Sequence, residues 1–534
     1  MKTLATAFVY GAVLCGGLYM AFQPTFDSRF ARTQTETGDG MLNHYILEHT
    51  WRAVFDPDYR GSLASPPCFF PTKWTIWYSE PLFGVAPAYW ALRVAMPCDL
   101  AYQWWQIAMS GLNFVAFAVV ARRLGCDHIL TIGSAFVWAW GIAQVYYSEH
   151  QQMIPRFWMP VAVYYAWQFV TAPDLKPLNR MLAAVFLQSA TCVYTAWFLV
   201  VGLTVFIPVA VVLSPGGCSR LWGAVRARKW AFARVTVLWT LALIAYFAPF
   251  VIVNLDTGRD YAECLNMAPT WDSWLNGPQN QPYPWKEVLR PHLPEELPHH
   301  ECQLFSGFAI YLLMIVGGVS ALVGRLLGCR RPELTLVAAA FLAALAWFLL
   351  TLKWGASSAS AWEWARHVPG GQAIRVVGRV YVLVYLFGGL AGMVWANLAT
   401  NRLSNRWLRW AVQSVISGAL VFEQIGPVPE SFVKEDYYPQ AARVAVHLRG
   451  ADAAYVLPHY GPNNVHGDIF AMWIGLYANV PVVNGYSGRY PTDFPSVNAG
   501  NPDHLRAWLR GRFRGRVAII DPTHPEEVVY VDIE

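Results

Sequence analysis

Long apolar runs recur along the chain from its N-terminus to about residue 425, and they constrain the fold more than any other feature. The first run extends from Leu4 to Phe22. Of the 534 residues, 55% are hydrophobic and only 14% are charged, whereas roughly 25% of the residues in soluble domains are charged. We therefore expect a polytopic, mainly α-helical membrane protein.

Basic residues give these runs a consistent orientation. Lys2 precedes the first run, and Arg122 and Arg123 follow the run that begins at Ala101, so both positions are expected in the cytoplasm. This requires that the short segment Pro81–Pro97 does not cross, and we predict an interfacial or re-entrant segment there. The prediction is a helical bundle of about 11 spans plus that segment, with spans near 4–22, 101–120, 128–146, 153–172, 179–194, 196–213, 234–253, 304–325, 333–352, 374–397 and 408–425.

The first run has a second interpretation, a cleaved signal peptide. Gly16 and Gly17 are followed by more apolar residues without a clear small-residue cleavage site. We therefore favour a retained helix.

The same orientation places four regions outside the membrane, at residues 23–100, 147–152, 254–303 and 353–373. With the spans, they form a predicted transmembrane domain at 1–425. Pro427 and Pro429 mark a linker at 426–436. Residues 437–534 alternate helix-like and strand-like runs, so we expect a small extracytoplasmic α/β domain there.

The charge distribution and the cysteine spacing argue against nucleic-acid binding and against a zinc site built on cysteines. The net charge of +5 belongs to loops, and nothing in its distribution indicates nucleic acid as a partner. Nine cysteines form no CxxC pair and no zinc-like spacing, and His292, His299 and His300 are interpreted as loop residues. Cys264 and Cys302 bracket the long outer loop, where we expect them to form a disulfide.

Acidic residues gather in the first outer loop, from Glu36 to His49. Asp39 lies between two glycines, at the expected start of a helix over 41–55 that also carries Asn43 and Glu48. One interpretation is structural: Asp39 caps the helix and Glu48 pairs with Arg52. The other is that these groups act on a substrate at the membrane surface.

A second polar stretch is the short outer turn at Glu149 and His150, which precedes Arg156. A turn between two spans needs polar residues, but an acid, a histidine and a nearby arginine are a richer set than a turn requires. We therefore treat all three as candidate site residues.

A third candidate is the pair Arg375 and Arg379, at the outer start of an apolar span. Four residues apart on a helix, they are expected to face the same way. They would either snorkel to the interface or hold a lipid phosphate, because the guanidinium fork matches phosphate oxygens.

Several short motifs resemble the GT-C class of bacterial membrane glycosyltransferases with a C-terminal extracytoplasmic domain. The matching stretches are Gly38–Gly40 with Asn43 and Glu48-His49; Glu149–Gln151 before Phe157–Pro160; Val368–Gly371 leading into Arg375 and Arg379; and Pro481–Gly488 near Pro491. The resemblance implies a polyprenyl-phosphate sugar donor and an extracytoplasmic active site. It implies Asp39 as catalytic base, with Glu149 assisting or binding a divalent metal such as Mg²⁺ or Mn²⁺.

The expected function is therefore glycosyl transfer at the outer face of a bacterial inner membrane, from a polyprenyl-phosphate-linked sugar to an unspecified acceptor. The catalytic candidates are Asp39, Glu149 and His150, and the substrate-binding candidates are Asn43, Glu48, Arg156, Arg375 and Arg379. Two alternatives stay open. One is a transporter or flippase for lipid-linked sugars, and the other is a non-catalytic membrane assembly protein that binds a partner through its C-terminal domain.

Overall fold

The structure is a computed structural model that describes residues 2–146, 150–254, 258–278, 281–294, 300–354, 359–457, 465–491, 494 and 502–534. Within these ranges, 8 helical segments are long and apolar enough to cross a membrane. The expected multi-pass helical architecture is therefore confirmed. The eight segments are Leu4–Ala21, Cys98–Arg123, His128–Val145, Val193–Leu213, Lys229–Val253, Phe308–Leu326, Pro332–Thr351 and Val377–Thr400.

These segments belong to the long helices of the chain. The helices are α1 (Lys2–Ala21), α5 (Cys98–Arg123), α6 (His128–Trp140) with α7 (Ile142–Tyr146), α10 (Val193–Leu213), α12 (Lys229–Val253), α15 (Phe308–Leu326), α16 (Pro332–Thr351) and α18 (Tyr381–Thr400). Three other expected spans are also helical but shorter: α8 (Trp158–Thr171), α9 (Leu175–Thr191) and α19 (Arg406–Phe422) have 14, 17 and 17 residues.

The segment expected not to cross forms α4 (Ala86–Ala95), a helix of 10 residues. At 1.5 Å per residue it is about 15 Å long, half the thickness of the hydrocarbon core. Its length therefore agrees with an interfacial or re-entrant position.

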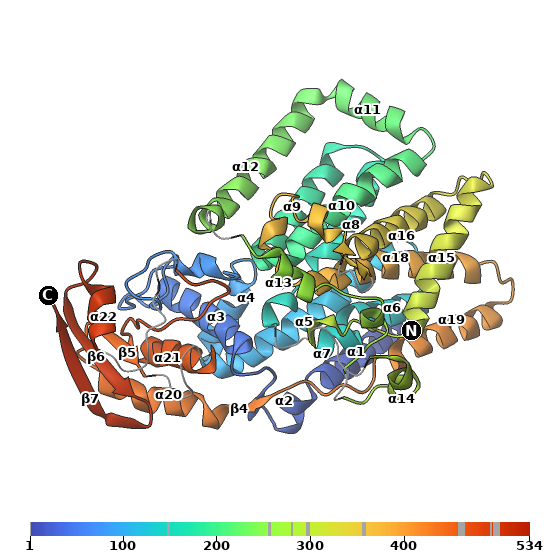
Figure 1. The fold of residues 1–534 in the computed structure, drawn as a ribbon. Coiled ribbons are helices and arrows are strands. Elements are labelled where there is room, and N and C mark those ends of the chain that lie inside the picture. Colours follow the sequence, from blue (N-terminus) through green and yellow to red (C-terminus); the bar gives the residue numbers. More distant parts are fainter. Residues whose placement is uncertain are drawn as a thin grey trace.

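Helix α18 lies at the centre of the bundle and is buried along nearly its whole length. Its glycines allow neighbouring helices to approach closely. A Cβ atom added at Gly392 would lie 2.9 Å from the Cβ atom of Leu313 in α15. By contrast, none of the membrane-spanning window of α12 is buried, and α12 projects with α11 (Gly217–Ala227) from the bundle in Figure 1.

The C-terminal region, residues 437–534, contains a three-stranded mixed sheet. Its strands are β5 (Ala453–Val456), β6 (Gly515–Asp521) and β7 (His524–Ile533). They are ordered β5-β6-β7, with β5 parallel and β7 antiparallel to β6. Helices α20 (Tyr438–Ala445), α21 (Val465–Ala478) and α22 (Pro502–Leu509) accompany the sheet, as the α/β pattern of the sequence predicts.

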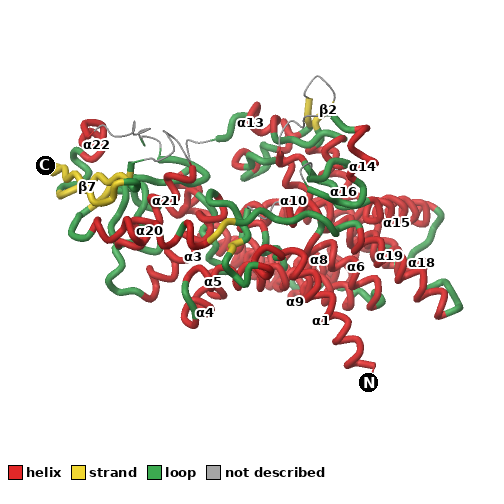
Figure 2. The backbone as a smooth tube through the Cα atoms, turned by 90° about the horizontal axis from the view of Figure 1, so that it is seen from below, coloured by secondary structure: helices red, strands yellow, loops and turns green. Residues whose placement is uncertain are grey.

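The first outer loop packs against this C-terminal region rather than standing apart from it. Its helix α3 (Asp39–Phe55) lies beside α21 at one end of the molecule (Figures 1 and 2). Tyr45 and Trp473 share one buried cluster, and the Trp473 indole donates to the carbonyl of Met41 at 3.3 Å. Strand β1 (Arg32–Thr33) also pairs with β4 (Phe432–Val433), inside the predicted linker.

The remaining short elements lie mostly in the predicted outer loops. They are α2 (Gln23–Asp27), α13 (Tyr261–Asn266), α14 (Lys286–Leu289), α17 (Trp362–Ala365), β2 (Lys353–Trp354), β3 (Ala359–Ser360), and the 3₁₀ turns Thr75–Tyr78, Gln151–Met153, Asp272–Trp274, Arg290–His292, His300–Cys302, Gly371–Ala373, Val377–Val380, Lys434–Asp436 and Val446–Leu448.

The expected disulfide between Cys264 and Cys302 is absent, and both are free thiols. The Cys264 thiol donates to the carbonyl of Ile374 at 3.2 Å, and the Cys302 thiol donates to the carbonyl of Ala268 at 3.8 Å. The loop brings each sulfur to a different backbone acceptor. The disulfide prediction was therefore wrong.

Candidate functional site

A neighbouring acid satisfies the amide groups at the start of α3, which leaves Asp39 available for other contacts. The carboxylate of Glu36 accepts hydrogen bonds from the backbone amides of Gly38 and Gly40. These are donors that a helix N-terminus leaves without intrahelical partners. The residue before the helix is Gly38, which makes no side-chain cap. The capping role proposed for Asp39 therefore belongs to Glu36.

The carboxylate of Asp39 is held between two side chains from distant parts of the chain. The Tyr486 hydroxyl donates to Oδ1 at 3.0 Å, and His150 Nδ1 lies 3.2 Å from Oδ2. Burial favours the neutral acid, but the charged His150 beside it and the hydrogen bond from Tyr486 outweigh burial and lower the pKa of Asp39. The carboxylate is therefore ionised near neutral pH.

His150 continues this arrangement to a buried ion pair. Its Nε2 lies 3.0 Å from Oε1 of Glu301, and Glu301 is paired with Arg379 through contacts of 2.6 and 3.1 Å. Asp39, His150, Glu301 and Arg379 thus form a continuous series, called here the charged row. It alternates acidic and basic groups, and all four side chains are mostly removed from solvent.

The charges of the row set the protonation of its members. Burial and Arg379 oppose a charge on His150, but Glu301 and Asp39 overcome them and raise the pKa of His150 to about 9. Burial would raise the pKa of Glu301, yet Arg379 and His150 hold it well below its usual value. At neutral pH the row therefore holds two carboxylates, an imidazolium and a guanidinium.

Glu301 was not among the candidates from the sequence. It lies at the end of the long outer loop, directly after His299 and His300, which were interpreted as loop residues. The sequence did contain a signal for Glu301 as a site residue, because it is an acid that follows His300 and directly precedes an apolar span. Its partners His150 and Arg379 are 151 and 78 residues away in the sequence, so only the fold brings them together.

Asn43 supports the backbone of the site. Its amide nitrogen donates to the carbonyl of Asp39 at 2.7 Å and to the side chain of Gln152 at 2.8 Å. It therefore joins the start of α3 to the turn that carries His150. Glu149, from the same turn, lies outside the described residues.

Glu48 is fully buried and is engaged by protein groups. Its carboxylate accepts from Arg93 at 2.9 Å, from Arg52 at 3.2 Å and from the Tyr89 hydroxyl at 2.8 Å. The Glu48–Arg52 pair of the structural interpretation is present, and Arg93 adds a tie to α4. These contacts fix α4 against α3, and a role for Glu48 in substrate binding stays a prediction.

Arg156 is likewise buried among protein acceptors. It lies in the connection between the Gln151–Met153 turn and α8, and its guanidinium joins that connection to the end of α6. The acceptors are the carbonyls of Met153, Ile154, Trp138 and Ala139 and the side chain of Gln144. Phosphate binding by Arg156 stays a prediction.

Arg375 and Arg379 do not share a helix face, so that expectation was wrong. The Tyr194 hydroxyl accepts from the backbone amides of Arg375 and Val376, both at 2.8 Å. These donors are thereby withdrawn from helical pairing, and the α-helix begins only at Tyr381. Arg379 turns inward to Glu301, whereas the Arg375 side chain is 39% exposed and lies 3.9 Å from Glu263.

Two further arginines lie near the same acid, and with Arg375 they form what we call the arginine cluster: Arg259, Arg375 and Arg489. Arg259 is 3.8 Å from Glu263 and also donates to the carbonyl of Gly488. Among the described residues, no group accepts a hydrogen bond from the buried Nη1 atom of Arg489. Burial and the charge of Arg259 lower the pKa of Arg489.

The residues of the site do not converge on a metal. Within the described ranges, no group of three or more His, Cys, Asp or Glu side chains could hold a metal ion. The two ring nitrogens of His150 face different carboxylates, and Glu301 is occupied by Arg379. Dependence on Mg²⁺ or Mn²⁺ stays a prediction.

Neither a protein-family model nor a curated protein matches the sequence. Among solved structures, ArnT from Cupriavidus metallidurans in the apo state is similar at 11% identity and a TM-score of 0.41, covering 98% of this chain and 94% of that one. The Archaeoglobus fulgidus oligosaccharyltransferase in complex with Zn and sulfate is similar at 11% identity and a TM-score of 0.46, covering 89% and 62%.

Proposed function

We propose that the protein is an integral membrane glycosyltransferase that moves a sugar from a polyprenyl-phosphate donor to an extracytoplasmic acceptor, with Asp39 as the general base. The observation that carries this proposal is the Asp39 carboxylate, which is relieved of capping by Glu36 and kept ionised by His150 and Tyr486. A base must be ionised before it can accept a proton.

The reaction needs few groups from the protein. Asp39 accepts the proton of an acceptor hydroxyl as the hydroxyl oxygen attacks the anomeric carbon of the sugar. The bond between that carbon and the phosphate oxygen breaks, and the electron pair leaves with the lipid phosphate. Because the phosphate is already a leaving group, the protein must supply a base and a cationic site for the developing charge.

The arginine cluster is the cationic site that we assign to the donor phosphate. Arg259, Arg375 and Arg489 each interact with the carboxylate of Glu263, so among the described residues of this cluster three positive charges face one negative charge. Arg489 is three residues from Tyr486, which contacts the base. The charge of Arg375 also acts on the hydroxyl of Tyr486. Arg379, the other candidate for phosphate binding, is paired with Glu301. Through Glu301 it orients His150.

A transfer assay tests the base directly. Membranes containing wild-type protein or Asp39→Asn are supplied with a panel of labelled polyprenyl-phosphate sugars, and label transferred to acceptor is measured. The substitution keeps the size of the side chain and leaves the Glu36 cap in place, so normal insertion is expected. Transfer should fall roughly a hundredfold or more, because the proton acceptor is lost.

Asp56→Asn provides the matched control, because Asp56 directly follows the other end of α3. It removes the same charge and should transfer sugar at the wild-type rate. Near-normal transfer by well-expressed Asp39→Asn would contradict the base assignment and move it to Glu149. Movement of intact lipid-linked sugar across the membrane, without transfer by any variant, would favour the transporter instead.

A further inference from the structure

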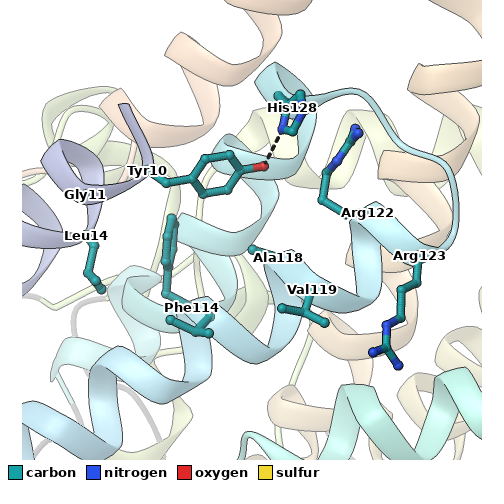
Figure 3. A pocket seen from close by; sticks show the side chains of 10 residues that line it. Tyr10, Gly11, Leu14, Phe114, Ala118, Val119, Arg122, Arg123 and His128 are labelled. Carbon is teal, nitrogen blue, oxygen red and sulfur yellow. Dashed lines mark hydrogen bonds between the residues drawn. The ribbon is translucent and has the colours of Figure 1, made fainter. Parts of the chain in front are cut away.

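A groove between α1 and α5 shares no residue with the charged row and has no part in the proposed reaction. Its volume is about 540 Å³. Its walls are Tyr10, Gly11 and Leu14 from α1 and Phe114, Val115, Ala118 and Val119 from α5, and one end holds Arg122, Arg123 and His128 (Figure 3). The groove is thus apolar along its length and basic at one end.

The dimensions of the groove match part of a lipid tail. From Phe114 to Arg122 the helix α5 advances about 12 Å at 1.5 Å per residue. One leaflet of the hydrocarbon core is about 15 Å thick. Val115 and Val119 are 43% and 46% exposed along this path. An acyl chain lying in the groove would cover Val115 and Val119. It would contact the protein along most of the thickness of one leaflet.

Among the described residues, the two guanidinium groups at the basic end have no carboxylate in direct contact, although the charge of Asp127 acts on the neighbouring His128. Within the described ranges, neither Arg122 nor Arg123 lies within 4.0 Å of a carboxylate oxygen. Arg122 donates to the carbonyl of Cys126, and Arg123 donates to the Tyr165 hydroxyl at 3.4 Å. Each guanidinium has five N–H groups, so donors remain for a phosphate.

A polar contact fixes the geometry of this end. The Tyr10 hydroxyl and Nδ1 of His128 are 3.2 Å apart, which ties α1 to the start of α6. Figure 3 shows Tyr10 and His128 in contact beside Arg122, with Arg123 one residue farther along the same helix. Basic pockets between spans on the cytoplasmic side are suited to anionic lipid head groups.

We propose that this groove binds an anionic glycerophospholipid of the inner leaflet. One acyl chain lies against α1 and α5, and the phosphate contacts Arg122, while Arg123, whose side chain points the other way (Figure 3), adds positive charge at the same end of the groove. The proposal commits to this occupant because an apolar trough ending in two cations complements a lipid with a long tail and a negative head group. A zwitterionic phospholipid fits the trough equally well but offers no net negative charge.

The test uses the purified full-length chain in detergent, with lipid binding measured by native mass spectrometry. Dioleoyl-phosphatidylglycerol and dioleoyl-phosphatidylcholine have the same tails, so a difference in binding reports the head group. Wild type should bind phosphatidylglycerol about tenfold more tightly or better, since each basic residue near the surface contributes to such attraction. Equal affinity for the two lipids would overturn the proposal.

Paired variants separate local charge from total charge. Arg122→Gln with Arg123→Gln should abolish the preference for phosphatidylglycerol. Arg330→Gln with Arg331→Gln removes the same charge from another adjacent pair, in an exposed loop after α15, and should preserve the preference. Loss of the preference in both double variants would assign it to overall charge and overturn the groove as its source.

A steric variant tests the trough without touching the charge. A Cβ atom at Gly11 or at Gly16 would meet no heavy atom within 4 Å, so leucine is accommodated at either position. Gly11 lines the groove and Gly16 does not. Gly11→Leu should weaken binding of both lipids about tenfold, whereas Gly16→Leu should not. Equal lipid binding by Gly11→Leu and Gly16→Leu would contradict the groove as the binding site. Displacement of phosphatidylglycerol by equimolar polyprenyl phosphate would contradict a glycerophospholipid as its occupant.

Discussion

The hydroxyl of Tyr486 lies 3.0 Å from Oδ1 of Asp39, although 447 residues separate them in the sequence. Tyr486 belongs to the Pro481–Gly488 string, which runs beside both β5 and the first outer loop. Val483 donates to the carbonyl of Ala454 at 2.8 Å, and Phe69 donates to the carbonyl of Asn484 at 2.9 Å. The C-terminal region thereby places the Tyr486 side chain in contact with the candidate base, Asp39.

Replacing Tyr486 with phenylalanine should change the pH dependence of transfer more than the fold. The hydroxyl lowers the pKa of Asp39 by stabilising its ionised form, so its loss raises that pKa. The acidic limb of the rate profile should move to higher pH, and transfer at neutral pH should fall by about tenfold or less. A pH series of kcat/KM measures this.

Tyr530→Phe is the control, because this tyrosine lies in β7 far from Asp39 in the sequence and is 46% exposed. Its profile should match wild type. An unchanged acidic limb in folded Tyr486→Phe would show that the hydroxyl does not tune the base.

Removal of Arg489 should weaken donor binding. Arg489→Gln keeps a polar side chain but removes one cation from the arginine cluster, and charge-assisted bonds to phosphate are among the stronger hydrogen bonds. KM for the donor should rise about tenfold with little change in kcat, because the ground state and transition state both contain the phosphate. Arg449→Gln, at an exposed position in the C-terminal region, is the control and should have the KM and kcat of wild type. A fall in kcat alone for Arg489→Gln would contradict a role of Arg489 in donor binding.

His150 should make stability depend on pH. Its folded-state pKa is raised from 6.5 to about 9, so the protonated form is stabilised by the fold. That contribution is complete below about pH 6.5 and is lost as the pH rises through about 9, amounting to about 3 kcal/mol at most. The melting temperature in detergent should therefore fall across this window.

In His150→Gln the same window should be nearly flat, since the titrating group is gone. His447→Gln, which replaces an exposed histidine, should retain the wild-type decrease. A wild-type decrease that persists in His150→Gln would place the titration elsewhere.

The two loop cysteines should both be reduced. Protein denatured without reductant and then alkylated should carry a label at Cys264 and at Cys302, because neither forms a disulfide. In the native state labelling should be slow, since both thiols are buried and burial raises the pKa of Cys302 to about 12. A mass lower by two hydrogens and two missing labels would show the bridge instead.

The expected membrane architecture came directly from composition and periodicity. Apolar runs long enough to span a bilayer predict helices with little ambiguity, because lipid leaves the backbone few other ways to satisfy its hydrogen bonds. The α/β pattern after Pro429 likewise predicted the elements of the C-terminal sheet. Asp39 and His150 could be selected because each lies in a short polar stretch of a chain in which only 14% of the residues are charged.

The tertiary structure decided how these residues are used. Contacts within the fold decide that Glu36 rather than Asp39 caps α3. Contacts between distant segments also decide the partners of Arg375 and Arg379. The positions of Glu301 and Tyr486 depend on such contacts as well. Helical periodicity describes only neighbours three or four positions apart. A site assembled from an outer loop, a turn, a loop end and the C-terminal region has no such local signal, so only the folded chain determines it.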